Sequence, residues 1–290
     1  MEYQIENDQL IIKIKSKGAE LFSIVNKQTH LEYMWGADPK FWAKSSPVLF
    51  PIVGTLKENT YRYQNKNYTL SRHGFARDEE FKVTDQQKDS ITFLLTSTLS
   101  SKEKYPFDFE LRIKYEVKEQ GLSTQYEVKN KGNEEMYFSL GAHPAFKVPL
   151  SKKLNYEDYF IEFNKTESAE RWPITKEGLI DTKTQPVITN GNRISLTREL
   201  FAKDAIVLKQ LNSTSVDLKS NSDEHGFTFH FKEFPFLGIW AQPGADFVCI
   251  EPWCGIADSV NHNQDLTTKE GIEKLTASKS WSRTWNTDFY

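Results

Sequence analysis

The stretch Phe109–Val117 reads FELRIKYEV, an alternation of apolar and charged residues without a break. This period of two is typical of a half-buried β-strand, because successive side chains of a strand point to opposite faces of the sheet. A polar turn, KEQG at Lys118–Gly121, follows, and the alternation resumes in LSTQYEV at Leu122–Val128. Two such runs joined by a short segment containing glycine predict a β-hairpin.

The same pattern of alternating runs and polar turns recurs along the chain. It is found at residues 10–14, 61–70, 81–95 and 227–231. Helical signals are limited to Asp38–Trp42, with Asp as N-cap and Pro at the first helical position, and to Thr197–Phe201. Because no linker or change of composition divides the chain, we expect one domain over residues 1–290, an all-β protein built as a large antiparallel β-sandwich.

Composition excludes several functional classes. The net charge is −3, so no basic field would attract nucleic acid or an anionic membrane. No apolar run reaches the roughly 18 residues that span a bilayer. The start of the chain, Met1–Glu6, lacks the pattern of a secretory signal. Only two cysteines are present, and a reduced, cytoplasmic protein is therefore expected.

Two histidines stand where glycine or proline interrupts an apolar run. His73 lies in SRHGFAR at Ser71–Arg77, and His143 lies in LGAHPAF at Leu140–Phe146. Functional side chains concentrate where the backbone leaves a sheet, so both are candidates for a site. The alternative is that each imidazole hydrogen-bonds to its own loop, and the spacing alone does not decide between the two.

A carboxylate ends the apolar run FVCIEPWCG. Glu251 there must be paired, hydrogen-bonded or neutral with a raised pKa. Beside an imidazole it could act as a general base, while Trp253 could offer a flat face to the C–H face of a sugar. A structural salt bridge is the open alternative.

No His-x-x-x-His pair occurs, and Cys249 and Cys254 cannot make a thiolate site alone, so no metal is expected.

Taken in order, these segments resemble the aldose 1-epimerase (galactose mutarotase-like) family, and within it the LacX-like, mutarotase-related branch. The matching segments are PVLFPIVG at 47–54, RHGFAR at 72–77, GAHPAF at 141–146, WAQP at 240–243 and IEPW at 250–253. The resemblance implies a β-supersandwich and interconversion of hexose anomers without a metal or organic cofactor.

The resemblance also implies a role for each matching residue. Glu251 corresponds to the general base, His143 to the acid that protonates the ring oxygen, and His73 to a histidine that hydrogen-bonds the sugar. Further sugar-contacting residues suggested in this way are Asp204, Trp240 and Gln242.

One position departs from the family pattern. Relatives often carry arginine where this chain has Thr55, and that arginine helps to hold the sugar. Lys57 would share the strand face of Thr55 and could replace it as a point charge, though not as a bidentate fork. Arg72 and Arg77 are the other candidates. The substrate is accordingly expected to be a small-molecule sugar, either a hexose or a hexose phosphate, bound by a monomer or homodimer.

The expected reaction is ring opening and reclosure by general acid and base. Unperturbed glutamate and histidine titrate near about 4.3 and about 6.5, so between these values Glu251 would be ionised and His143 protonated. The rivals are a hexose-6-phosphate mutarotase, a non-catalytic sugar-binding or sensing protein, and a glycoside hydrolase, which usually needs two carboxylates.

Overall fold

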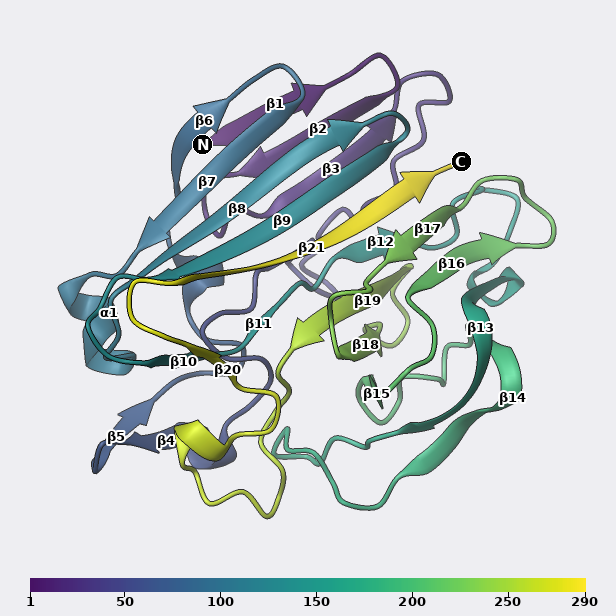
Figure 1. The fold of residues 1–290 in the computed structure, drawn as a ribbon. Helices are drawn as coiled ribbons and strands as arrows, with labels where there is room; N and C mark the ends of the chain where they lie inside the picture. Colours follow the sequence, from purple (N-terminus) through teal and green to yellow (C-terminus); the bar gives the residue numbers. More distant parts are fainter.

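The computed structural model describes residues 1–290 and is built almost entirely of antiparallel strands, 21 of them, with one α-helix and four short 3-10 helices (Figure 1). The prediction of an all-β, antiparallel fold is confirmed. No helix in it is both long and apolar enough to cross a bilayer.

The largest element is a nine-stranded sheet. From edge to edge its strands are β14 (Gln185–Ser195), β13 (Tyr159–Arg171), β16 (Ser215–Ser220), β17 (Phe227–His230), β21 (Ser280–Phe289), β9 (Gly121–Asn130), β8 (Phe109–Lys118), β7 (Ser90–Thr96) and β6 (Lys82–Gln86).

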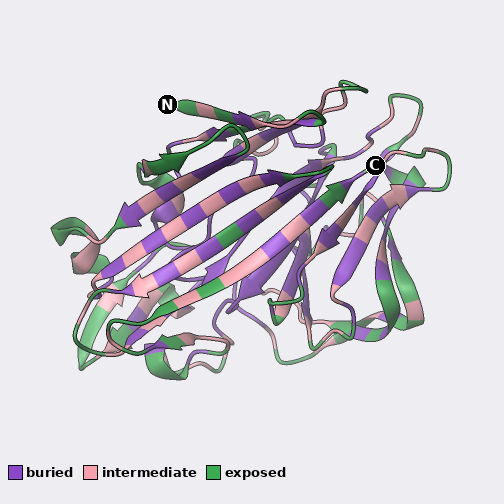
Figure 2. Ribbon diagram, turned by 45° about the horizontal axis from the view of Figure 1, so that its top comes forward, coloured by how far each residue is buried: buried purple, intermediate pink, exposed green.

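The predicted hairpin forms the β8–β9 pair of this sheet. Lys118 pairs with Gly121, so the turn is the two residues between them, and Glu119 takes a positive φ of 49°. Along β8 the residues alternate between buried and half-buried, as the sequence pattern requires. Figure 2 shows the same alternating bands along the long strands. One face of the sheet therefore covers the core while the other meets solvent.

A five-stranded sheet lies against this large sheet. It consists of β11 (Leu140–Gly141), β19 (Phe247–Cys254), β18 (Phe236–Trp240) and β15 (Ile206–Lys209), with β12 (Ala145–Lys147) also paired to β19. The two sheets are in contact where the ring of Phe146 on β12 lies 4.2 Å from that of Phe227 on β17, centroid to centroid. Most buried apolar residues join in one cluster of 70, and a second cluster of seven includes Trp253 and Val207.

Smaller elements complete the fold. They are the sheet β1 (Glu2–Glu6), β2 (Leu10–Lys15) and β3 (Leu21–Asn26), the pairs β4 (Thr60–Tyr63) with β5 (Lys66–Thr69) and β10 (Met136–Phe138) with β20 (Glu273–Leu275), the helix α1 (Leu99–Lys104), and the 3-10 helices η1 (Lys57–Asn59), η2 (Ala76–Asp78), η3 (Tyr156–Asp158) and η4 (Leu266–Thr268).

Of the two helical signals, the one at Asp38–Trp42 gave the short turn expected of it, with the Asp38 carboxylate accepting from the N–H of Lys40, and the one at Thr197–Phe201 gave no helix. Asp38–Trp42 forms a single hydrogen-bonded turn, in which the carbonyl of Asp38 accepts from Phe41 and Trp42, and Thr197–Phe201 forms turns without a helix. The α-helix that does form, α1, was not foreseen. Thr98 and Ser101 cap its N-terminus reciprocally, a local signal that its short length and lack of buried residues made inconspicuous.

Candidate active site

Strand β19 carries Glu251 into the interior. All eight residues of this strand are buried, because β18 pairs with one of its edges and β11 and β12 with the other. Glu251 is 1% exposed and stands opposite Gly238, which has no side chain to compete for the space. A carboxyl group is thereby placed in a setting that penalises its charge.

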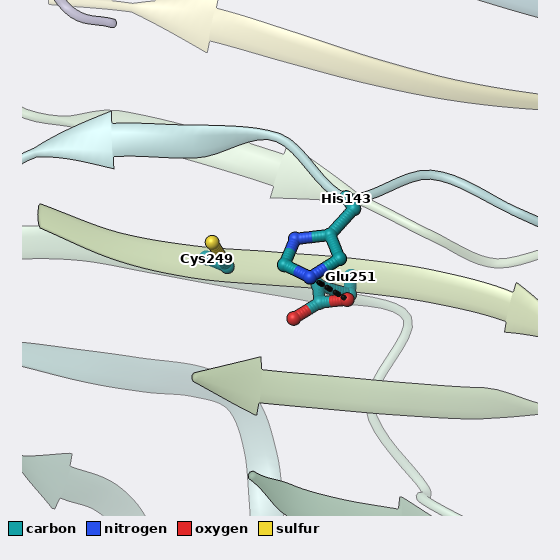
Figure 3. Close-up of side chains that lie close together, drawn as sticks. All are labelled: His143, Cys249 and Glu251. Atoms are coloured by element: carbon teal, nitrogen blue, oxygen red, sulfur yellow. Dashed lines mark ion pairs between the residues drawn. The ribbon is translucent and has the colours of Figure 1, made fainter. Parts of the chain in front are cut away.

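His143 faces this carboxyl group from the loop that follows β11. Its Nε2 lies 3.3 Å from Oε2 of Glu251 (Figure 3). The indole of Trp42 stacks on the imidazole at a centroid distance of 4.9 Å and an interplanar angle of 29°, and Trp240 meets the imidazole edge-on at 5.7 Å. Two aromatic rings therefore fix the orientation of His143 toward Glu251.

Burial reverses the usual order of the two pKa values. It raises the pKa of Glu251 well above its ordinary value and lowers that of His143 to about 3. When the pair holds one proton, that proton resides on the carboxyl group, and both side chains are neutral. The expectation of an ionised Glu251 beside a protonated His143 in the resting protein used the pKa values of exposed groups, and burial shifts both pKa values against it.

His73 is locked by two hydrogen bonds to one residue. Its backbone N–H donates to the carbonyl of Gly54, and the N–H of Gly54 donates to Nδ1 of the imidazole at 3.1 Å. An accepting Nδ1 means that the neutral ring carries its proton on Nε2. Burial lowers the pKa of His73 well below its ordinary value, with smaller contributions from His143 and two arginines, so the ring is neutral.

Arg72 adds a second donor next to this imidazole. Its Nε lies 3.3 Å from Nε2 of His73, and its terminal nitrogen lies 3.5 Å from a carboxylate oxygen of Asp204. The N–H groups of Gly54 and Arg72 therefore approach the two ring nitrogens of His73, and a neutral imidazole accepts at only one of them.

These groups open onto one cavity of about 520 Å³, within the range of small-molecule sites. The sequence-predicted residues that line it are Glu251, His143, His73, Asp204, Gln242, Trp240, Arg72, Arg77 and Trp253. They come from distant parts of the sequence, and the fold brings them to one place.

The structure corrects the prediction that Lys57 contacts the sugar. It does not line the cavity, and its ammonium group donates instead to the carbonyls of Val260 and His262. The argument for Lys57 assumed that it shares a strand face with Thr55. Strand periodicity does not apply there, because the chain enters the 3-10 helix η1 at Lys57.

Thr55, which stands where the resemblance implies arginine, is buried under the neighbouring loop. A side chain on Gly178 would meet its hydroxyl at 2.5 Å, and Gly178 itself lines the cavity. The loop that contains Gly178 therefore lies directly over the place where a longer side chain would have entered.

Sequence reasoning missed the apolar wall of the cavity and the aromatic residue behind His143. The residues concerned are Trp42, Ile174, Ile180, Phe201 and Val207. Trp42 is the last residue of the turn signal at Asp38–Trp42, and a turn signal does not reveal what its last side chain contacts. The two isoleucines belong to a loop, where no periodic pattern marks an inward face.

Trp253 lines the cavity because two glycines make room for its ring. A side chain on Gly141, its partner on β11, or on Gly238 of β18 would meet the indole at 2.5 Å. The ring is 5% exposed, so only a small part of it is available to a ligand.

One group of metal-ligating side chains lies at the same place. The ligand atoms of His143, Cys249 and Glu251 are all within 4.8 Å of one another (Figure 3). The spacing of residues along the chain did not indicate this cluster, because His143 comes from a different segment and only β19 supplies the other two.

Comparisons with known proteins identify the family of the chain. The family model for aldose 1-epimerase matches residues 1–272. The chain is 35% identical to the chromosomal LacX protein of Lactococcus lactis subsp. lactis, over 98% of this chain and 99% of that protein.

Solved structures give the same result. A galactose mutarotase related enzyme from Lactobacillus acidophilus superposes with a TM-score of 0.96 at 35% identity, over 100% of this chain and 97% of the other. A galactose mutarotase-like protein from Lactobacillus casei gives 0.94 at 31%, with both chains covered completely. The fold and the cavity thus define a protein of the galactose mutarotase-like type. The chain belongs to the aldose 1-epimerase family.

Proposed function

We propose that this protein interconverts the α and β anomers of a hexose, as an isomerase that works by general acid–base catalysis from one domain over residues 1–290. The observation that carries the proposal is the 3.3 Å contact between Glu251 and His143 in the cavity. Anomerisation needs one proton removed from the anomeric hydroxyl and one delivered to the ring oxygen, and a carboxyl–imidazole pair supplies both functions.

The reaction begins with ring opening. The Glu251 carboxylate takes the proton of the anomeric hydroxyl while protonated His143 gives a proton to the ring oxygen, and the bond between C1 and that oxygen breaks. The pair is then neutral, and the sugar is an open-chain aldehyde. After rotation about C1–C2, the C5 hydroxyl attacks the other face of the carbonyl, Glu251 returns its proton to the carbonyl oxygen, and His143 takes the hydroxyl proton.

The reaction therefore uses both protonation states of the pair, the ionised state for ring opening and the neutral state for ring closure. They contain the same number of protons and differ only in which side chain holds one of them. The free protein favours the neutral state, which is the state required for ring closure. Ring opening requires the ionised state, and hydroxyl groups of a bound sugar would supply the hydrogen bonds that stabilise those charges.

The remaining polar residues fit the role of positioning the sugar. His73 contributes an imidazole and Arg72 a guanidinium group 3.3 Å from it, and the carboxylate of Asp204 is an acceptor 3.5 Å from Arg72. Sugar hydroxyls both donate and accept, so a mixed set of this kind can orient them. Trp240 and Gln242 contribute one aromatic and one amide group to the same wall.

A second candidate is mutarotation of a hexose 6-phosphate. The guanidinium groups of Arg72 and Arg77 both line the cavity, and guanidinium groups suit a phosphate. Arg77, however, donates to the backbone carbonyl of Arg72, and Arg72 is paired with Asp204, so both are already engaged. For this reason we place the free hexose first.

Anomer-exchange NMR on a panel of free and 6-phosphorylated aldohexoses tests the proposal. Exchange should be accelerated by the wild-type protein and not by the Glu251→Gln variant. Acceleration of the phosphorylated sugars alone would favour the second candidate. Sugar binding without any acceleration would show a non-catalytic binding protein and would overturn the proposal.

A further inference from the structure

The sulfur of Cys249 completes a set of three donors around the acid–base pair. Cys249 and Glu251 are two residues apart on β19, so their side chains leave the strand on the same face. His143 lies over this face, and its ring, the sulfur and the carboxylate have ligand atoms within 4.8 Å of one another. The acid–base mechanism makes no use of the sulfur.

Two of the three groups contain buried polar atoms without a hydrogen-bond partner. These atoms are Nδ1 of His143 and Oε2 of Glu251, whose one polar neighbour is Nε2 of His143 at 3.3 Å in an approach that does not meet hydrogen-bond geometry. The side chain of Glu251 is 1% exposed and that of His143 is 10% exposed. Buried polar atoms are rarely left unpaired, and such a group calls for a ligand or a functional reason. A sugar would contact the acid–base pair, whereas a cation could engage all three side chains.

The donor types select one class of cation. A thiolate, an imidazole and a carboxylate together suit Zn²⁺, and a site with three protein ligands leaves a fourth position open. Hard cations such as Mg²⁺ and Ca²⁺ prefer oxygen donors only. Ligand atoms around zinc lie about 3.5 Å apart in a tetrahedron with bonds of about 2.0–2.3 Å, so side-chain movements of about 1 Å would close the set.

An ion has a route to this cluster. His143 and Glu251 line the 520 Å³ cavity, while Cys249 is fully buried beneath them. An ion entering through the cavity would meet the imidazole and the carboxyl group first and the sulfur last. The cavity itself would provide the open fourth position.

We propose that His143, Cys249 and Glu251 form a binding site for a thiophilic divalent cation of the Zn²⁺ and Cd²⁺ class, and that occupation of this site blocks sugar turnover reversibly. Metal binding is independent of the proposed function, whereas inhibition rests on it. The cation occupies the acid and the base at once, so metal and sugar exclude each other.

Cadmium titration monitored by ultraviolet absorption tests the site without reference to activity, because a thiolate bound to Cd²⁺ gives a charge-transfer band. The chain has only two cysteines, and Cys254, buried on the same strand, provides the matched control. The band should develop in wild type and in Cys254→Ser and be absent from Cys249→Ser. A band that survives in Cys249→Ser, or no band in wild type, overturns the site.

Affinity measured by calorimetry gives a second, independent test. Loss of an outer hydrogen-bonding partner already costs about 10–100-fold in metal affinity, so loss of a ligand should cost at least about tenfold. Glu251→Gln, which keeps the sulfur, should therefore retain the band and bind Cd²⁺ at least about tenfold more weakly. Unchanged affinity in this variant overturns the three-donor site even if Cys249→Ser does not fold.

Inhibition is measured on anomer exchange with Zn²⁺, using Mg²⁺ as the control ion. Zn²⁺ should inhibit wild type and Cys254→Ser, excess hexose should protect, and Cys249→Ser should need at least about tenfold more Zn²⁺. Equal inhibition of Cys249→Ser contradicts the proposal. A protein that shows the cadmium band but no exchange activity when free of metal would overturn the proposed function and leave the site standing.

Discussion

Oε2 of Glu251 and Nε2 of His143 lie 3.3 Å apart, and the protein interior reverses the order in which these two groups titrate. In water a glutamate loses its proton before a histidine does. Here burial favours the neutral form of each group, so the single proton of the pair stays on the carboxyl group. The contact also makes the pair one titrating unit, whose apparent pKa values belong to both residues together.

The pH profile of activity should reflect this unit. The pair is competent while it holds one proton. A second proton is added near the lowered pKa of His143, about 3, and the single proton is lost only at the raised pKa of Glu251. The value of kcat/KM, which reports on the free protein, should therefore stay level between about pH 4.3 and 6.5. An unperturbed glutamate and histidine would instead give an acidic and a basic limb of the pH profile at these two values. Limbs at those two values would show that the pair titrates as if exposed.

Replacing Glu251 with glutamine should separate stability from turnover. The pKa of Glu251 is raised in the folded protein, so its contribution to stability is complete below its unfolded pKa, about 4.3, and is lost as pH rises toward the folded value. A glutamine side chain does not titrate, so the Glu251→Gln variant does not lose stability in this way as the pH rises. The variant should therefore melt above wild type at pH 8, with the difference vanishing near pH 4, and turnover should fall about 10²–10⁴-fold.

Thermal melts at the two pH values, sugar titration and anomer exchange on one preparation check this prediction. Glu251→Asp is the matched control, because it keeps the carboxyl group while shortening the side chain. A Glu251→Gln protein that melts lower at pH 8 and exchanges at the wild-type rate would falsify the assignment of Glu251 as base.

The strands that position the site could be predicted because their signal is local. The alternation in Phe109–Val117 specifies which side chains face the core, and the structure has those positions buried. Glu251 was recognised for a similar reason, since a carboxylate at the end of an apolar run is unusual. Each conclusion needed only the residues of one segment.

The parts that could not be predicted depend on contacts between segments. Stacking of Trp42 on His143 joins two loops about 100 residues apart in sequence, and nothing in either segment indicates the other. The direction in which burial shifts the pKa of Glu251 could not be predicted for the same reason, because that burial requires the neighbouring strands β18 and β11 to be in place. The prediction for Lys57 was wrong because its local structure is a 3-10 helix and not the strand that was assumed.

The two cavity histidines should respond differently to substitution by asparagine. His73 lines the cavity beside Arg72, so His73→Asn should mainly raise KM. His143 contacts Glu251, the proposed base, so His143→Asn should mainly lower kcat, by about 10²–10⁴-fold. Steady-state exchange rates over a range of sugar concentrations separate an effect on KM from one on kcat. A lowered kcat in His73→Asn together with a raised KM in His143→Asn would mean that the roles of the two histidines are reversed.

Lys57 and Arg72 provide a test of where sugar is held. Lys57→Met should leave KM unchanged, and because two bonds from the ammonium group to carbonyls are lost it should lower stability by about 1–3 kcal/mol. Arg72→Gln should raise KM with little change in stability, since the side chain is 45% exposed. Melting curves and KM values for both variants decide the matter. A raised KM in Lys57→Met would restore lysine to the sugar site.

Trp42 should act as a positioning residue for proton transfer. Its ring lies flat on the imidazole of His143 at 4.9 Å, and its backbone carbonyl is held by a 2.9 Å hydrogen bond from the indole of Trp35. An aromatic face attracts a cation by about 0.5–2 kcal/mol, so the stack favours the protonated imidazole that ring opening requires. Trp42→Leu should therefore lower kcat by about 2–30-fold, as that free energy implies.

Trp42→Phe keeps an aromatic face over the imidazole and should recover most of the lost kcat. Anomer-exchange rates at saturating sugar measure both variants, and circular dichroism confirms that each is folded. If phenylalanine were no better than leucine, the stack would serve packing alone.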